Sequence, residues 1–212
     1  MIKPNTHVFL ATPAYSGKLN IPYTIAYAQT LLLLAQNNIK VTPYITASGS
    51  LLVAERNAIV EEFWHSDATH LLCVDGDLGW PAAAVMAMLD AEKEFIAGCY
   101  PARNPAGGQE NTFLFRPVQN ENKSIVQDKH LLKMEYIPAG FMLISRSAIR
   151  KMRKKFPELY YEPKAAHDIN PKKGFCFFNT EVWNGEFWGE DYVFCRKARE
   201  AGVDIWVDPL DR

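Results

Sequence analysis

The stretch Leu71-Leu72-Cys73-Val74-Asp75-Gly76-Asp77 decides the fold of this 212-residue chain. Four consecutive apolar residues before a charged segment are typical of a strand that is buried on both faces, as in the parallel sheets of α/β proteins. The two aspartates follow at the carboxyl end of this strand, the edge at which open α/β sheets bind their ligands. The sequence therefore predicts an α/β fold with a polar site at this strand end.

The rest of the first half repeats a strand followed by a helix. Short apolar runs alternate with longer stretches of helical periodicity, which open at a proline or at a serine that can cap the helix. The expected strands are 8–11, 41–45 and 95–99, and the expected helices are 22–34, 50–64 and 81–89. This alternation predicts an open sheet covered by helices on both faces.

The second half is less regular. Its expected elements are a paired 113–115 and 134–137, strands at 141–144 and 203–207, a long loop at 157–173 and a helix at 190–201. The helix is expected to stop at Gly202, since glycine is the common residue just past a helix end. We therefore expect a central mixed, mostly parallel β-sheet flanked by helices rather than a purely parallel sheet.

The composition is that of an ordinary globular protein, with 48% hydrophobic and 22% charged residues. The 23 basic and 24 acidic residues give a formal net charge of -1, so no broad positive field exists to attract nucleic acid. We interpret the one basic run, Arg146–Lys155, as a solvated helix face.

The four cysteines are widely separated and mostly lie in apolar runs, which favours reduced core residues over a disulfide framework or a zinc site. They are Cys73, Cys99, Cys176 and Cys195. No run approaches the roughly 20 apolar residues of a membrane span, and the N-terminus lacks the apolar stretch of a signal peptide. We therefore expect a cytoplasmic protein without a membrane span.

Asp75 and Asp77 have the chemistry of a divalent-cation site. Their hard carboxylate oxygens can hold Mn²⁺ or Mg²⁺ when water and substrate phosphate supply the other ligands, and the glycine between them lets the backbone turn tightly. Such a cation would screen the charge that grows on a departing diphosphate. The alternative is a hairpin turn, which Asp-Gly between apolar runs also indicates. The following Leu78-Gly79-Trp80-Pro81 leads into an expected helix and not into a returning strand, which favours the metal site.

A second acidic pair, Glu190-Asp191, opens the last expected helix. The helix dipole favours acidic residues in a first turn by roughly 0.3–1 kcal/mol, so a purely structural role would also explain them. However, Trp183, Phe187 and Trp188 precede the pair and are suited to stacking on a sugar ring and excluding water. A carboxylate in these surroundings can take the proton of an acceptor hydroxyl.

Three motifs resemble those of glycosyltransferases with the GT-A fold. Residues 71–77 look like the apolar strand and Asp-x-Asp motif of that family. Pro138-Ala139-Gly140-Phe141-Met142-Leu143-Ile144 is similar to the mid-domain glycine-aromatic strand, and Trp188-Gly189-Glu190-Asp191-Tyr192-Val193-Phe194-Cys195-Arg196 to the Glu-Asp helix start. The motifs span nearly the whole chain, which also resembles a glycosyltransferase domain encoded by chlorella viruses. For a viral protein of this kind, the resemblance implies a location in the cytoplasm of the host cell.

The resemblance implies a metal-dependent enzyme that moves a sugar from a UDP-sugar donor to a glycan or glycoprotein acceptor. It implies one GT-A (Rossmann-like) domain over residues 1–212, with a nucleotide-binding half at 1–105 and a sugar and acceptor half at 106–212. It assigns Asp77 and Asp75 to Mn²⁺ or Mg²⁺; Thr12, Pro13, Ala14, Tyr15, Arg56, Asn57, Asp75 and Gly76 to the donor nucleotide; Asp191 and Glu190 to catalysis; and Tyr100, Arg103, Gly140, Phe141 and Trp188 to the sugar or acceptor. For Arg56 and Asn57, exposed polar positions on a helix are an equally good explanation.

The chain departs from the family pattern after the last expected strand, where many members carry a histidine as a further metal ligand. Here Trp206-Val207-Asp208-Pro209 runs straight to Arg212, so Asp208 is one alternative ligand and His167, in the long loop, a remoter one. The abrupt end also suggests one domain of a longer polypeptide, whose further domains would be partners.

Two other functions remain open on the sequence. An Asp-x-Asp after a buried strand also serves magnesium-dependent phosphotransferases and phosphatases, in which the first carboxylate is the nucleophile. In those enzymes the motif usually follows the first strand, whereas here it follows the third expected strand. A nucleotide-sugar-binding module without turnover is the non-catalytic alternative. For an enzyme, Asp191 as the base predicts inversion, whereas in a retaining enzyme it would orient the donor sugar or the acceptor.

Overall fold

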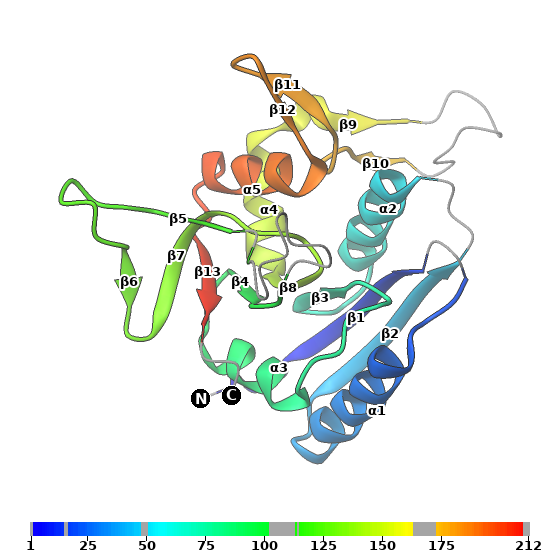
Figure 1. The fold of residues 1–212 in the computed structure, drawn as a ribbon. Coiled ribbons are helices and arrows are strands. Elements are labelled where there is room, and N and C mark those ends of the chain that lie inside the picture. The colour runs from blue at the N-terminus through cyan, green and yellow to red at the C-terminus, as the bar shows by residue number, and fades with distance from the viewer. Residues whose placement is uncertain are drawn as a thin grey trace.

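The computed structural model of this chain describes residues 2–14, 17–47, 51–101, 113, 115–162 and 173–209. Figure 1 shows an α/β architecture in which a central twisted sheet lies between two layers of helices. This is the fold class that the sequence predicts.

The helices and strands alternate through the first half, as expected, and become irregular in the second. The helices are α1 (Ile21–Gln36), α2 (Leu52–His65), α3 (Ala82–Asp90), α4 (Arg146–Lys155) and α5 (Glu190–Glu200), with a short 3-10 helix at Pro157–Leu159. The strands are β1 (His7–Ala14), β2 (Lys40–Ala47), β3 (His70–Val74), β4 (Phe95–Gly98), β5 (Arg116–Pro117), β6 (Gln127–Asp128), β7 (Leu131–Tyr136), β8 (Phe141–Ser145), β9 (Tyr160–Tyr161), β10 (Gly174–Phe175), β11 (Glu181–Trp183), β12 (Glu186–Trp188) and β13 (Ile205–Asp208). None of the helices in the described residues is both long and apolar enough to cross a membrane.

Nine strands of the described residues form one mixed sheet, in the order β2-β1-β3-β8-β4-β13-β7-β5 with β6 paired to β7. Strands β1 to β4 and β13 run in one direction, because β1 is parallel to β2 and β3, β13 is parallel to β4, and β8 is antiparallel to both β3 and β4. Strand β7 runs in the opposite direction to β13. The expected mixed, mostly parallel sheet is therefore confirmed, and β8 inserts a strand from the second half of the chain between two strands from the first.

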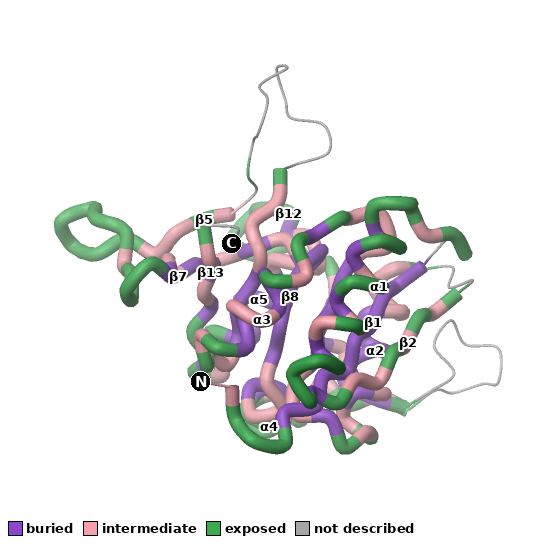
Figure 2. Tube along the Cα trace, turned by 90° about the horizontal axis from the view of Figure 1, so that it is seen from below, coloured by how far each residue is buried: buried purple, intermediate pink, exposed green. Residues whose placement is uncertain are grey.

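Alternate residues of each central strand face opposite helix layers, as the two-residue period of a strand requires. On one face Phe9 and Leu71 pack with α2, α4 and α5, and on the other Leu10 and Leu72 pack with α1 and α3. Strand β1 is therefore buried along its whole length, whereas the neighbouring edge strand β2 is partly exposed (Figure 2). Two apolar faces on each central strand explain why these segments read as continuous apolar runs.

Three sequence predictions differ from the structure at their edges. The segment paired with β7 is Arg116–Pro117, and the described Phe113 and Phe115 lie outside any strand. Helix α2 begins at Leu52, and the expected capping residue Ser50 lies outside the described residues. The expected loop at 157–173 begins with the 3-10 helix and β9, and its residues 163–172 are also outside the described part.

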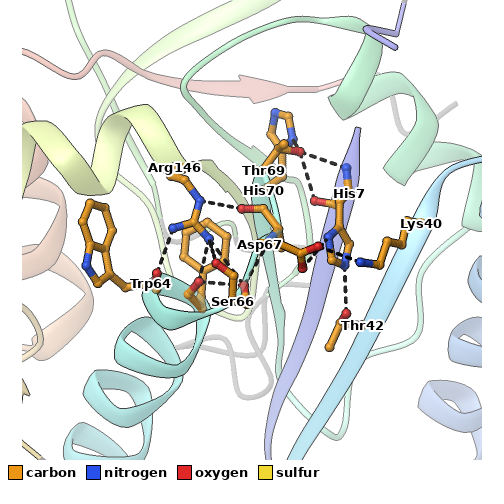
Figure 3. A network of polar contacts seen from close by, with 11 residues as sticks. His7, Lys40, Thr42, Trp64, Ser66, Asp67, Thr69, His70 and Arg146 are labelled. Carbon is orange, nitrogen blue, oxygen red and sulfur yellow. Dashed lines mark hydrogen bonds and ion pairs between the residues drawn. The ribbon is translucent and has the colours of Figure 1, made fainter. Parts of the chain in front are cut away.

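The basic run of α4 is only partly the solvated face predicted from the sequence. Arg150, Lys154 and Lys155 are exposed, as expected. Arg146, in contrast, donates hydrogen bonds to the carbonyl oxygens of Phe63 and Trp64 near the end of α2 and of Ser66 and Ala68 just beyond it, at 2.8, 2.9, 2.8 and 2.6 Å (Figure 3). These carbonyl groups belong to the last turn of α2 and the residues just after it, where the regular hydrogen bonds of a helix end, and a cation near a helix C-terminus is also favoured by the dipole.

Replacing Arg146 by methionine is expected to lower the free energy of unfolding by about 2–3 kcal/mol, because one charged group that satisfies several helix-end carbonyls is lost. Urea unfolding followed by circular dichroism measures the change. The matched control is Arg150→Met, an exposed arginine one turn later on the same helix. It should change the free energy by no more than about 0.5 kcal/mol. Equal losses in both variants would contradict the capping role.

Candidate active site at the carboxyl edge of the sheet

The segment Asp75-Gly76-Asp77 forms a tight turn at the end of β3. The Asp75 N–H donates to the Gly140 carbonyl at 2.9 Å, and the Leu78 N–H donates back to the Asp75 carbonyl at 3.1 Å. The chain then enters α3 and does not return as a strand. The hairpin explanation of Asp-Gly is therefore wrong, and the two carboxylates stand at the edge where an open α/β sheet binds ligands.

Gly76 lets this turn pack closely against the segment before α1. Its carbonyl accepts a hydrogen bond from the Asn20 N–H at 2.9 Å, and a Cβ atom at position 76 would lie 3.0 Å from Leu19 Cδ2. The glycine thus serves close approach within the protein. The Asp77 Oδ1 atom is shielded from solvent.

Arg56 of α2 joins the two acidic motifs that the sequence keeps far apart. Its side chain is only 3% exposed. One guanidinium nitrogen, Nη2, donates to both carboxylate oxygens of Asp75 at 3.1 and 3.3 Å. The other, Nη1, donates to Glu190 Oε1 at 3.0 Å and to Asp191 Oδ1. The end of β3 and the start of α5 therefore meet on one arginine.

The start of α5 is held in place from a second side as well. The Ala139 N–H donates to Asp191 Oδ2 at 3.1 Å, so Asp191 lies between a backbone amide and the guanidinium. The residue before the helix, Gly189, has no side chain to cap it. The acidic pair therefore faces the site while it occupies the positive end of the helix dipole.

The electrostatics of this cluster favour a cation. Burial alone would lower the pKa of Arg56, but Asp191 and Asp75 raise it, so the guanidinium stays charged. One positive charge faces the carboxylates of Asp75, Glu190 and Asp191, and Asp77 lies two residues along the chain. Burial raises the pKa of Asp191 above the usual range of an aspartate, and Arg56 opposes that shift.

Tyr100 and Gly140 border the site beside the end of β4. The Tyr100 hydroxyl oxygen accepts a hydrogen bond from the Gly140 N–H at 2.8 Å, and a Cβ atom at position 140 would lie 2.4 Å from that oxygen. Burial raises the pKa of the Tyr100 hydroxyl, which therefore stays protonated. Tyr100 and Phe141, with Leu78 to Pro81 and Cys99, line a small pocket with a cavity volume of about 20 Å³.

Several residues assigned to the donor have their side chains turned into the protein. The Thr12 hydroxyl is fully buried and bonds the Tyr23 hydroxyl. Asn57 is 4% exposed, and its amide exchanges hydrogen bonds with the backbone of Phe178 at 2.8 and 2.9 Å. Pro13 and Ala14 are buried at the end of β1. The alternative that Arg56 and Asn57 are exposed helix positions is wrong, since both are buried. Tyr15, Arg103 and His167 lie outside the described residues.

The aromatic residues before α5 divide between core and surface. Trp188 is buried and packs edge-to-face on Tyr136 and Trp183, with ring centroids 5.2 and 5.0 Å away. Strands β11 and β12 form a hairpin whose Val182 and Phe187 lie opposite each other and are 73% and 74% exposed. The hairpin leads directly into the acidic pair at the start of α5.

The described residues hold no group of three or more His, Cys, Asp or Glu side chains that is placed to bind a metal ion. Asp208, the alternative third ligand, contacts His130 Nε2 at 3.4 Å. Its strand β13 is separated from β3 by β8 and β4, which is about 14 Å at the usual strand spacing. A cation at this edge of the sheet would therefore depend on Asp75 and Asp77 and would have to take its remaining ligands from water and a substrate diphosphate.

Sequence reasoning found the carboxylates of this site but missed what connects them. Arg56 was assigned to the donor, and no periodicity signals that its guanidinium reaches three carboxylates. The Ala139 amide could not be found either, because a backbone donor carries no sequence signal. None of the four cysteines, all of which lie in the described residues, forms a disulfide; Cys73 and Cys195 are buried, while Cys99 and Cys176 are partly exposed.

The sequence matches no protein-family model and none of the curated proteins. Among solved structures, the chain is similar to 4-diphosphocytidyl-2C-methyl-D-erythritol synthase from Anaerococcus prevotii, with 8% identity and a TM-score of 0.41 over 78% of this chain and 83% of that one. It is also similar to S. aureus TarS 1-349, with 13% identity and a TM-score of 0.44 over 95% of this chain and 58% of that one. For a longer TarS chain the values are 14% and 0.47, over 95% of this chain and 35% of that one. Because these likenesses are so distant, we take the function from the side chains of this chain.

Proposed function

We propose that this protein is a metal-dependent glycosyltransferase that moves a sugar from a UDP-sugar donor to a hydroxyl group of a glycan acceptor. The observation that carries the proposal is the meeting of Asp75, at the end of β3, with Glu190 and Asp191, at the start of α5, on the buried Arg56. A site for cation and diphosphate thus lies beside a site for proton transfer, as glycosyl transfer to a hydroxyl requires.

Asp75 and Asp77 would hold Mn²⁺ or Mg²⁺ together with the donor diphosphate. A bound cation of this kind supplies the positive charge that stabilises the leaving diphosphate. The cluster holds more carboxylates than guanidinium groups, which favours binding of such a cation. Because the protein offers the cation few ligands, we expect the cation to bind together with the diphosphate. The turn at Gly76 keeps both carboxylates at the sheet edge.

Asp191 is the residue that we assign as general base for the acceptor hydroxyl. It accepts hydrogen bonds from Ala139 N–H and Arg56, which fix its orientation, and its raised pKa makes it a stronger base than an exposed aspartate. Glu190 would bind the acceptor or the donor sugar beside it. The exposed Val182 and Phe187 of the β11–β12 hairpin would contact the apolar face of the acceptor sugar.

The geometry disfavours the phosphotransferase alternative. Its nucleophile would be Asp75, but both oxygens of that carboxylate accept hydrogen bonds from Arg56. The motif also follows the third strand of the chain, β3, and not the first. The binding module without turnover shares the same site and differs only in its lack of product formation.

Thermal unfolding in the presence of nucleotides tests the proposal, because a ligand that binds only the folded state raises the melting temperature. UDP with Mn²⁺ is expected to raise the Tm by several degrees, and Mn²⁺ alone or UDP alone by much less. ADP and CDP with Mn²⁺ are the controls that test whether binding is selective for the uracil base. No shift with any nucleotide and Mn²⁺ would refute the proposal, whereas a shift without transfer or hydrolysis over a broad acceptor panel would favour the binding module.

A further inference from the structure

Among the described residues, the hydrogen bonds and ion pairs of the Arg56 guanidinium are all with carboxylates, and its Cζ atom lies 5.8 Å from the centroid of the Phe178 ring. Its two terminal nitrogens carry all four of the hydrogen bonds to Asp75, Glu190 and Asp191. Its Nε is buried without a hydrogen-bond partner among the described residues. A guanidinium in this position has little capacity left for a nucleotide. We infer that Arg56 is a positioning residue and the internal counter-ion of the site, which competes with the divalent metal for Asp75 and does not bind the donor.

The competition follows from the way Asp75 is used. Both oxygens of its carboxylate face Arg56 Nη2, at 3.1 and 3.3 Å, and the same oxygens are the ones a metal would need. A divalent cation beside the guanidinium is repelled by it, in a partly buried site where screening is weak. The inference rests on the proposed function, since it concerns the cation of that same site.

The positioning role follows from the rigid fork of the guanidinium. One planar group bonds Asp75, at the end of β3, and Asp191, in α5, at the same time. It therefore links the metal carboxylate directly to the base, in addition to the backbone bonds that Ala139 and Gly140 make with the same two residues. A lysine keeps the charge but presents one nitrogen, and it cannot reproduce the geometry at both ends. Charge and geometry can therefore be separated by two substitutions at the same position.

Arg56→Met removes the charge and keeps most of the length of the side chain. Without nucleotide, this variant is expected to bind Mn²⁺ at least about tenfold more tightly than the unchanged protein, because the repulsion is gone and the carboxylates lack a counter-ion. Its transfer rate should nevertheless fall, since Asp191 then keeps only the hydrogen bond from Ala139 N–H. Free Mn²⁺ measured by electron paramagnetic resonance gives the affinity without reference to activity.

Arg56→Lys is the second variant, and it remains informative if the methionine variant does not fold. Its Mn²⁺ affinity is expected to stay within about threefold of the unchanged protein, because the charge is kept, while kcat falls about tenfold or more and the KM for the donor changes little. Tighter Mn²⁺ binding by the lysine variant would overturn the inference. So would a rise in the donor KM at constant kcat, which is the mark of a donor contact.

Arg153→Met is the matched control. Arg153 is also a largely buried arginine that pairs with a carboxylate, Glu61, at 2.7 Å, but neither residue contacts the site carboxylates. The variant should lose stability without any change in Mn²⁺ affinity. If Arg56→Met behaves in the same way, Arg56 is only structural and the inference fails. If the unchanged protein and all variants bind no Mn²⁺ even with UDP, it is the proposed function that fails.

Discussion

Asp191→Asn is expected to lower kcat by about a hundred- to ten-thousandfold, which is the usual contribution of a positioned general base. Asparagine keeps the shape of the side chain, but it cannot take a proton, and its one carbonyl oxygen can replace only one of the two oxygens that accept from Ala139 N–H and Arg56 Nη1. Because Asp191 is not a proposed ligand of the donor diphosphate or the cation, donor binding should change little. Steady-state kinetics with the donor, together with the UDP-dependent Tm shift, measure both quantities.

The neighbouring Glu190→Gln provides the comparison for this substitution. Glu190 carries the same charge as Asp191 and also accepts a hydrogen bond from Arg56 Nη1. Among the described residues, however, the backbone N–H of Ala139 donates to Asp191 and not to Glu190. We expect a smaller loss in kcat, of about tenfold. If Glu190→Gln were the more damaging change and Asp191→Asn kept most of the activity, the roles of the two residues would have to be exchanged.

The environment of Asp191 also predicts how activity and stability depend on pH. Burial raises its pKa, so the acidic limb of kcat/KM should lie above the ordinary aspartate value of about 3.9. The folded state holds this proton more tightly than the unfolded chain does. The contribution of Asp191 to the free energy of unfolding is therefore full below the unfolded pKa and is lost as the pH rises through the folded pKa. In Asp191→Asn this part of the pH dependence should disappear.

The fold was predictable from the sequence because its central strands are buried on both faces. The apolar runs of β1, β3 and β4 and the intervening helices follow from that burial. The place of β8 was not predictable, since an apolar run does not say which strands it will join or in which direction. The short β5 escaped prediction because its two residues carry too little pattern.

The carboxylates of the candidate site were predictable for a different reason. Asp75, Asp77, Glu190 and Asp191 stand at element boundaries, where the chain leaves a buried strand or enters a helix. Arg56 and Arg146 show the limit of such reasoning. Each lies within or at the start of a helix, and its partners come from elements far away in the sequence, so only the tertiary structure shows that one joins the acidic motifs and the other caps α2.

Asp77→Asn is expected to abolish the Mn²⁺-dependent part of UDP binding and to lower kcat/KM by at least about a hundredfold, because a cation at the leaving diphosphate contributes several kcal/mol to the transition state. Asp77 is the principal ligand in our proposal because Asp75 is shared with Arg56. The amide keeps the shape of the carboxylate, so the folded structure should survive although its Oδ1 is shielded from solvent. Urea unfolding checks this point.

The control for Asp77→Asn is Asp204→Asn, which removes a carboxylate that is 58% exposed and pairs with Lys133 at 2.7 Å on the surface. A surface pair of this kind contributes little to stability, so UDP binding, Mn²⁺ dependence and rate should all stay as they are. If Asp77→Asn kept its Mn²⁺-dependent Tm shift with UDP, the metal would have to be held elsewhere. If Asp77→Asn lost that shift while Asp191→Asn kept it, donor binding would depend on the β3 end of the site and proton transfer on the α5 end. These are the two ends that Arg56 joins.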